Sequence, residues 1–192
     1  HFTDRRQRQM CIRDSDTRAD IKNLFQGENR MNSFVGYQSP EIFEGVTFTV
    51  NSISQTTGSF DSYGLNYSKG SLKVAIASDS NAKGYDNKRF ASTFSLDSLD
   101  IDVGVLYQTT KKLSTGISEN GHVVSVKKNV FEKGSIYYQT SSSDIKLESG
   151  EQNSFGYTHK ISKVSKVFVH ASNLVSDTKN VDYVSVGFEY KF

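Results

Sequence analysis

The chain has 192 residues, a formal net charge of +2, a hydrophobic content of 35% and a mean hydropathy of −0.51. Such a length suits one ordinary domain with a sizeable core. No run approaches the roughly 18 apolar residues of a transmembrane helix, which excludes a helical span. It does not exclude a membrane barrel, because barrel strands alternate between two faces and give a much weaker hydropathy signal.

The first fourteen residues, HFTDRRQRQMCIRD, differ from the rest of the chain. They hold four arginines and Cys11, the only cysteine, and they show no strand period. They resemble a translated sequencing adapter, so we predict that residues 1–14 are non-native sequence. The alternative is a basic arm that binds nucleic acid, but nothing else in the chain supports nucleic-acid binding.

Without residues 1–14, the remaining basic residues (23 − 4 = 19) balance the remaining acidic residues (21 − 2 = 19). No cysteine remains, which fits a protein exported through an oxidising compartment. The chain also lacks a natural start. We therefore expect a fragment whose front half is missing.

One stretch predicts a helix, residues 17–25, with Asp16 or Thr17 as its N-cap. Beyond it, apolar and polar residues alternate, because successive side chains of a strand point to opposite faces. We count eleven strands of about 8 to 12 residues. They are centred on residues 33–37, 46–50, 63–67, 72–77, 89–96, 99–108, 124–126, 136–138, 155–157, 167–169 and 183–192.

The predicted connections alternate between short and long. Residues 69–70 make a short turn and 79–87 a longer loop, and residues 97–98 and 110–119 repeat the pattern. Tight turns at one end and polar loops at the other are typical of an up-and-down antiparallel meander. A soluble sandwich makes Greek-key crossings and does not sort its loops in this way.

The polar face of the predicted strands is unusually rich in charge. It carries Lys73, Arg89, Asp100, Asp102, Lys127, Lys160, Glu189 and Lys191 beside small residues. A small soluble barrel would need apolar residues on its inner face. Here one face of the predicted strands is apolar, and the other is polar and suited to contact with water. The fold class is therefore all-β, a transmembrane up-and-down antiparallel β-barrel, present as an incomplete barrel of about eleven strands.

The last twelve residues, VDYVSVGFEYKF, keep the alternation to the end of the chain. Val184, Val186, Phe188, Tyr190 and Phe192 share one side of the predicted strand. The tail of a soluble protein is normally frayed and polar, so we expect an apolar environment to receive this one. The alternative is a soluble edge strand packed on a core, but no helices are predicted that would cover the other strands.

Sequence motifs for catalysis are missing. The histidines (His1, His122, His159 and His170) are scattered without zinc-like spacing, and phosphate-binding loops and a G-x-S-x-G elbow are absent. Asp100 and Asp102 lie at i, i+2, which places them on one face of a strand, as a carboxylate dyad or as solvated lumen residues. We favour the lumen and predict no enzyme, no metal and no cofactor.

Three segments resemble the general porins of Gram-negative bacteria. The first is GENRMNSFVGYQSPEIFEG, residues 27–45, which resembles the pattern R-x-x-N-S-(I/V)-x-Y-x-S-P-x-F-x-G. The matching residues are Arg30, Asn32, Ser33, Tyr37, Ser39, Pro40, Phe43 and Gly45. One extra residue precedes Tyr37 and another precedes Phe43, which predicts a bulge. FGYTHKISKVSKVFVHASN, residues 155–173, resembles the penultimate hairpin of that family, and GFEYKF resembles its terminus.

The resemblance implies a sixteen-stranded, trimeric barrel whose third loop folds inward to narrow the pore. The eleven strands would then be the last eleven, forming residues 30–192, and residues 15–29 would be the remnant of the constriction loop. It also implies that Phe188, Tyr190 and Phe192 form a signal for the outer-membrane assembly machinery. Tyr190 and Phe192 would join the aromatic girdle at the membrane interface.

The implied function is passive diffusion of ions and small polar solutes through the outer membrane of a Gram-negative bacterium. The resemblance suggests acidic residues on the inward loop, here Asp16, Asp20 and Glu28, facing the basic wall residues Arg30 and Arg89. Asp16 and Asp20 fit a solvated loop surface equally well. The expected partners are membrane lipid, two further copies in a homotrimer, the assembly machinery and the solutes, without nucleic acid.

Two other functions stay open at this point. The first is a barrel that serves binding or adhesion through its extracellular loops. The predicted outer loops have roughly 6 to 10 residues, which is short for that role. The second is an outer-membrane hydrolase, which needs a Ser–His pair on the lipid face that we do not find.

Overall fold

The structure is a computed structural model that describes residues 21–27, 34–55 and 58–190. The strands are β1 (Phe34–Gln38), β2 (Val46–Gln55), β3 (Gly58–Lys69), β4 (Leu72–Ser80), β5 (Tyr85–Leu96), β6 (Ile101–Lys112), β7 (Ser118–Val130), β8 (Gly134–Ser143), β9 (Gly150–Lys160), β10 (Ser165–Ser176) and β11 (Lys179–Tyr190). Two 3-10 turns, η1 (Ile21–Asn23) and η2 (Asp97–Leu99), complete the described elements. None of the described helices has the length and apolar character of a membrane span.

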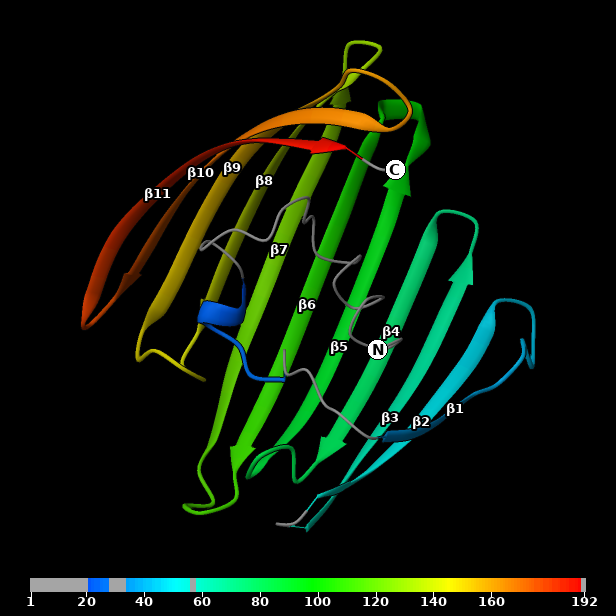
Figure 1. Cartoon of the computed structure of the whole chain (residues 1–192), viewed down its shortest axis with the longest axis vertical. Coiled ribbons are helices and arrows are strands. Elements are labelled where there is room, and N and C mark those ends of the chain that lie inside the picture. The colour runs from blue at the N-terminus through cyan, green and yellow to red at the C-terminus, as the bar shows by residue number, and fades with distance from the viewer. Residues whose placement is uncertain (1–20, 28–33, 56–57, 191–192) are drawn as a thin grey trace.

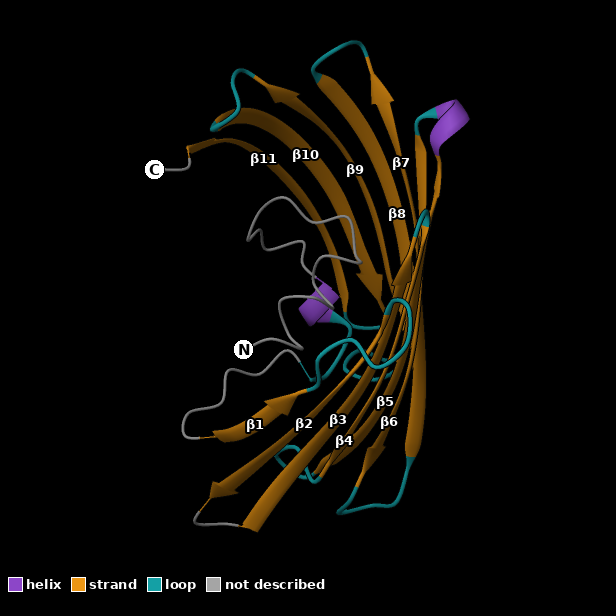
Figure 2. Ribbon diagram, turned by 90° about the vertical axis from the view of Figure 1, so that its right-hand side faces the viewer, coloured by secondary structure: helices purple, strands orange, loops and turns teal. Residues whose placement is uncertain are grey.

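All eleven strands form one antiparallel sheet, and each strand pairs with its neighbour in the chain, in the order β1 to β11. The sheet curves into an open trough, with β1 and β11 as its two edges (Figures 1 and 2). The predicted all-β meander of eleven strands, left as an incomplete barrel, is confirmed. The η1 turn lies in the hollow of the trough, and this identifies the concave face (Figure 2).

The convex face carries the apolar half of the alternation. Cross-strand register joins Phe94, Val103, Val126, Tyr138 and Phe155 into one outward row across β5 to β9. Large apolar side chains on this face are exposed, with 80% of Val186 accessible. Soluble proteins rarely expose a contiguous apolar surface of this extent. The convex face is therefore suited to hydrocarbon.

The predicted sorting of connections into short and long is wrong. The segments between strands have two to seven residues in the described part of the chain, and residues 113–117 replace the predicted loop 110–119. Strand pairing continues past the apolar band, where polar side chains also pair across the strands. Asn120 Oδ1, for example, accepts hydrogen bonds from Tyr107 Oη at 3.1 Å and Thr109 Oγ1 at 2.9 Å.

Two local predictions are also wrong. The described part of the predicted helix 17–25 contains only the 3-10 turn η1, and residues 17–20 lie outside the described residues. Leu99 belongs to η2, and Asp100 follows it with a left-handed φ of 52°. Strand β6 begins after this turn, so Asp100 and Asp102 are not neighbours on one strand face and the geometric argument for a dyad fails.

The predicted bulge before Tyr37 does not appear in β1. Its register with β2 is regular from Phe34↔Ile53 to Gln38↔Thr49. The extra residue before Phe43 is accommodated in the turn 39–45, where Phe43 forms an isolated bridge to Val46. Gly45 closes that turn with φ 83°, and a Cβ there would lie 2.5 Å from the Ser68 carbonyl oxygen.

Candidate functional site

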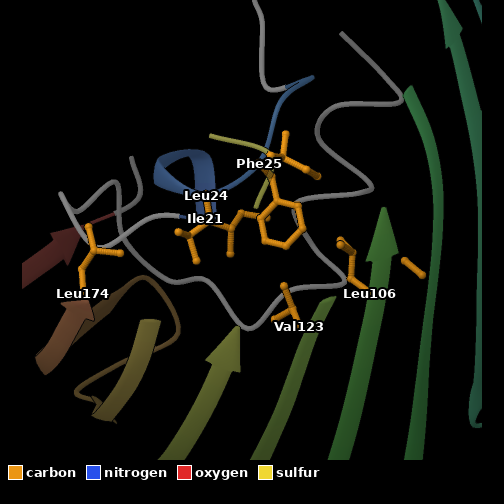
Figure 3. Packing of buried hydrophobic residues seen from close by; sticks show 8 residues of the cluster. Ile21, Leu24, Phe25, Leu106, Val123 and Leu174 are labelled. Atoms are coloured by element: carbon orange, nitrogen blue, oxygen red, sulfur yellow. The ribbon is translucent and has the colours of Figure 1, made fainter. Parts of the chain in front are cut away.

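The concave face holds a segment of the chain that packs against the wall. Leu24 and Phe25 have no exposed surface and contact a wall cluster (Figure 3). That cluster consists of Ala91, Leu106, Val123, Ile145 and Leu174. We call residues 21–27 the inward segment. Burial of two large apolar side chains stabilises its position by a few kcal/mol, at about 1.5–3 kcal/mol each.

Two glycines of the wall make room for these side chains. A Cβ at Gly121 would lie 2.5 Å from Phe25 Cε1, and one at Gly150 would lie 2.7 Å from Leu24 Cδ2. Both distances are below ordinary van der Waals contact, so any larger residue would displace the inward segment. The wall is thus shaped to receive Leu24 and Phe25.

Polar side chains of the wall bind the backbone of the same segment. Ser143 Oγ donates to the Leu24 carbonyl at 3.0 Å. The Gln26 carbonyl accepts from Arg89 Nη2 at 2.9 Å and from Gln108 Nε2 at 3.0 Å. These carbonyls belong to no regular element, and the wall supplies the donors that a buried backbone oxygen needs.

Arg89 lies on β5 directly opposite Gln108 on β6, and it is 8% exposed. Its Nε donates to Gln108 Oε1 at 2.7 Å. The carboxylate of Asp79, on β4, lies close to the same place, because a Cβ at Gly27 would be 3.6 Å from Arg89 Nη2 and 3.7 Å from Asp79 Oδ2. The positive charge of Arg89 is therefore partly balanced by a neighbouring carboxylate on the wall.

Away from the inward segment, two aromatic side chains of the wall pack against glycines of the neighbouring strands. Tyr137 covers Gly156 on β9, and Phe168 covers Gly187 on β11. In each case the glycine is the residue directly opposite on the neighbouring strand. Tyr137 Oη also bonds His170 Nδ1 at 2.6 Å.

At one end of the trough, a hollow of about 1030 Å³ lies between the β7–β8 and β9–β10 turns. Its lining includes Lys127 and Lys166, which form ion pairs with Asp102 at 3.6 Å and Glu189 at 3.2 Å. Both pairs are partly exposed to solvent, and exposed ion pairs stabilise a protein by about 1 kcal/mol or less. The lining of this hollow is net positive, with five lysines against three acidic residues.

Comparison with known proteins gives a result for the fold alone. No family model matches the chain, and no curated protein matches it. Among solved structures, an anion-selective porin from Comamonas acidovorans is similar, with a TM-score of 0.68, 17% identity and coverage of 84% of this chain and 60% of that one. The chain has a porin fold.

Two further structures agree. Salmonella typhi OmpF, in a complex with daunomycin, gives a TM-score of 0.69 at 13% identity, covering 83% of this chain and 62% of that one. A loop L8 deletion mutant of OmpT, an outer membrane protein of Vibrio cholerae, gives 0.66 at 14% identity with the same coverage. The chain therefore spans about 60% of the length of these three proteins.

Only part of the predicted constriction falls within the described residues. Arg89 lies on the concave wall and contacts the inward segment. Asp16, Asp20, Glu28 and Arg30 lie outside the described residues, so their placement in a constriction stays a prediction.

For the predicted assembly signal, Phe188 and Tyr190 lie on the convex face with 61% and 55% of their surface exposed, and Phe192 lies outside the described residues.

In the described part of the chain, no group of three or more His, Cys, Asp or Glu residues is placed to hold a metal ion.

Sequence reasoning missed the partners of Arg89. Gln108 lies in the strand predicted around residues 99–108, but no pattern within one strand shows that it stands opposite Arg89. That pairing depends on the register between β5 and β6, which is set by the η2 turn. The Gln26 carbonyl gives no sequence signal, because a backbone acceptor is present at every position.

Proposed function

We propose that the chain is the C-terminal part of a general porin, a trimeric, sixteen-stranded channel in the outer membrane of a Gram-negative bacterium. Ions and small hydrophilic solutes would diffuse passively through its water-filled lumen. The observation that carries this proposal is the two-sided sheet: an apolar convex face, a polar concave wall and a porin fold over most of the chain.

The open edges of the sheet support a larger closed barrel. The outer edges of β1 and β11 have no strand partner among the described residues. An unpaired backbone group in hydrocarbon costs several kcal/mol. Further strands would satisfy these edges, and the family resemblance sets their number at five. The shared length of about 60% with the similar porins fits such a missing portion.

The same proposal divides the chain into three parts. Residues 1–14 are non-native sequence, residues 15–29 are the remnant of the constriction loop, and residues 30–192 are the C-terminal part of the barrel. The packing of the inward segment on the concave wall supports the second assignment. Asp16, Asp20 and Glu28 would face Arg30 and Arg89 across the narrowing and set ion selectivity by charge.

A passive channel requires neither a catalytic group nor a cofactor, so we propose no enzymatic activity. A binding or adhesion role through extracellular loops has less support. The described connections between strands have seven residues or fewer, which leaves little surface for a partner. The exposed Phe188 and Tyr190 suit contact with membrane lipid and reading by the assembly machinery.

Planar bilayer recordings test the proposal. The longer protein that contains this chain, refolded and added at low concentration, should insert in stepwise conductance increments with weak ion preference. Size-exclusion measurement in detergent should give a trimer. A folded, inserted protein without conductance steps would overturn the channel function.

A further inference from the structure

Gln108 is the uncharged centre of the contact between wall and inward segment. It is fully buried, with 0% of its surface exposed. Its Oε1 accepts from Arg89 Nε, and its Nε2 donates to the Gln26 carbonyl and to Thr110 Oγ1 at 2.9 Å. Both donors and the acceptor of the amide are therefore used, which fixes the orientation of the side chain.

The hydrogen bonds run in one direction through two strands, β5 and β6. Thr110 Oγ1 accepts from Gln108 and donates to Asn87 Oδ1 at 2.8 Å, on β5. Gln108 in turn accepts from Arg89, and both of these side chains donate to the Gln26 carbonyl. Removing the Gln108 amide would leave Arg89 Nε, Thr110 Oγ1 and the Gln26 carbonyl each short of one partner. Buried groups without partners are costly, so the hydrogen bonds around the Gln26 carbonyl depend on Gln108.

We propose that Arg89, Gln108 and the Gln26 carbonyl form a latch, which we call the Gln26 latch, that holds the inward segment against the wall and so sets the open cross-section of the channel. Gln108 is then a positioning residue for the constriction, although it carries no charge. The proposal rests on the proposed channel function and adds a residue that charge-based reasoning does not select.

The latch gives Arg89 a second role besides its charge. A wall cation that acts only through its field needs no fixed geometry. Arg89, however, is 8% exposed and donates to two defined acceptors, Gln108 Oε1 and the Gln26 carbonyl. A change at Gln108 leaves the wall charge intact and breaks the latch, so this residue separates the two roles.

The first experiment compares two Gln→Leu variants of the longer protein in planar bilayers. Gln108→Leu removes the amide at nearly constant volume and charge. Gln139→Leu is the matched control, because Gln139 is also buried on the concave wall, in β8, at 6% exposure and outside the latch. We expect Gln108→Leu to raise the fraction of time spent at altered conductance by roughly tenfold, the effect of losing the one hydrogen bond that Gln108 donates to the inward segment. Gln139→Leu should behave like the parent.

A second experiment tethers the inward segment covalently. Ser143 Oγ lies 3.0 Å from the Leu24 carbonyl, so the two residues are neighbours when the inward segment is seated. Leu24→Cys with Ser143→Cys, in a Cys11→Ser background, then reports this contact by the rate at which oxidation joins the two thiols. The rate of cross-linking should fall when Gln108→Leu is added. Once formed, the disulfide should return the Gln108→Leu channel to parental conductance, because it replaces the lost latch. General damage to the barrel would not be repaired in this way.

The outcomes decide separately on the latch and the channel. Parental conductance for Gln108→Leu, or cross-linking that does not depend on Gln108, would overturn the latch while the channel stands. Altered conductance that the disulfide does not restore would also overturn it. A parent protein that cross-links but never conducts would overturn the proposed channel function and the proposed effect on its cross-section. The contact between the inward segment and the wall would still stand.

Discussion

Placing an arginine on either face of β11 tests the orientation of the sheet in the membrane. Val186 lies on the convex face with 80% of its surface exposed, and Ser185, the preceding residue, lies on the concave side. We expect Val186→Arg to destabilise the barrel far more than Ser185→Arg, because the first places a charge in lipid and the second places it in the lumen.

The magnitude follows from the depth of Val186. Tyr190, at the end of β11, lies in the expected aromatic girdle, and Val186 is four residues away. Four residues span about 13 Å of strand, which is roughly 10 Å along the membrane normal at a tilt of 35–45°. The apolar band is about 25 Å tall, so Val186 lies near its middle, where an arginine costs about 2–4 kcal/mol. Ser185→Arg should cost less than about 1 kcal/mol.

Equilibrium unfolding of the longer protein in lipid vesicles, followed against urea, gives both free energies. The comparison is sharp because a register shift of one residue would move every side chain to the other face and reverse the order. Equal tolerance of arginine at both positions would refute the assignment of the convex face to lipid and, with it, the membrane barrel.

Three further predictions concern selectivity, assembly and one turn. Replacing both Arg30 and Arg89 by Glu should shift selectivity toward cations, and an unchanged reversal potential under a salt gradient would remove both residues from the pore wall. Deleting Phe192 should scarcely affect refolding into detergent or lipid but should lower the yield of heat-modifiable barrel in an outer membrane, and equal yields would discard the assembly role. Gly45→Ala should destabilise the barrel by about 1–3 kcal/mol in urea unfolding, because its φ is 83° and the neighbouring strand's carbonyl oxygen is 2.5 Å from the added Cβ. Gly70→Ala is its control, since φ is also positive there but no atom lies within 4 Å, and equal losses would contradict the close approach.

The meander was predictable although the argument from loop lengths was wrong. Alternation with a period of two identifies strands and their faces locally, as in β11, where Val184, Val186 and Phe188 share the exposed side as expected. Short connections then favour pairing between consecutive strands, whatever their exact lengths. The lengths themselves could not be predicted, because hydrophobic alternation ends at the apolar band while backbone pairing continues beyond it.

The candidate site was less accessible to sequence reasoning. Arg89 could be selected as a wall cation from its place in the alternation, but its bonds to Gln108 and Gln26 depend on register and on a backbone carbonyl. The helix expected over residues 17–25 was wrong in its described part for a related reason. Ile21, Leu24 and Phe25 do show helical spacing, yet the wall, through Ser143 and Arg89, satisfies backbone carbonyls that a longer helix would have used internally.

One signal in the sequence does point to the inward segment, and it lies where the alternation fails. Leu106 follows Val105 directly, Val123 precedes Val124, and Leu174 precedes Val175, so each pair makes both faces of its strand apolar. In each pair, the residue outside the alternation is the one that faces the trough and contacts the inward segment (Figure 3). On a lumen wall that contacts only water, these three apolar side chains would be exposed and would gain no burial. Their presence on three separate strands, converging beneath Leu24 and Phe25, is best explained by a wall that is built to hold a loop.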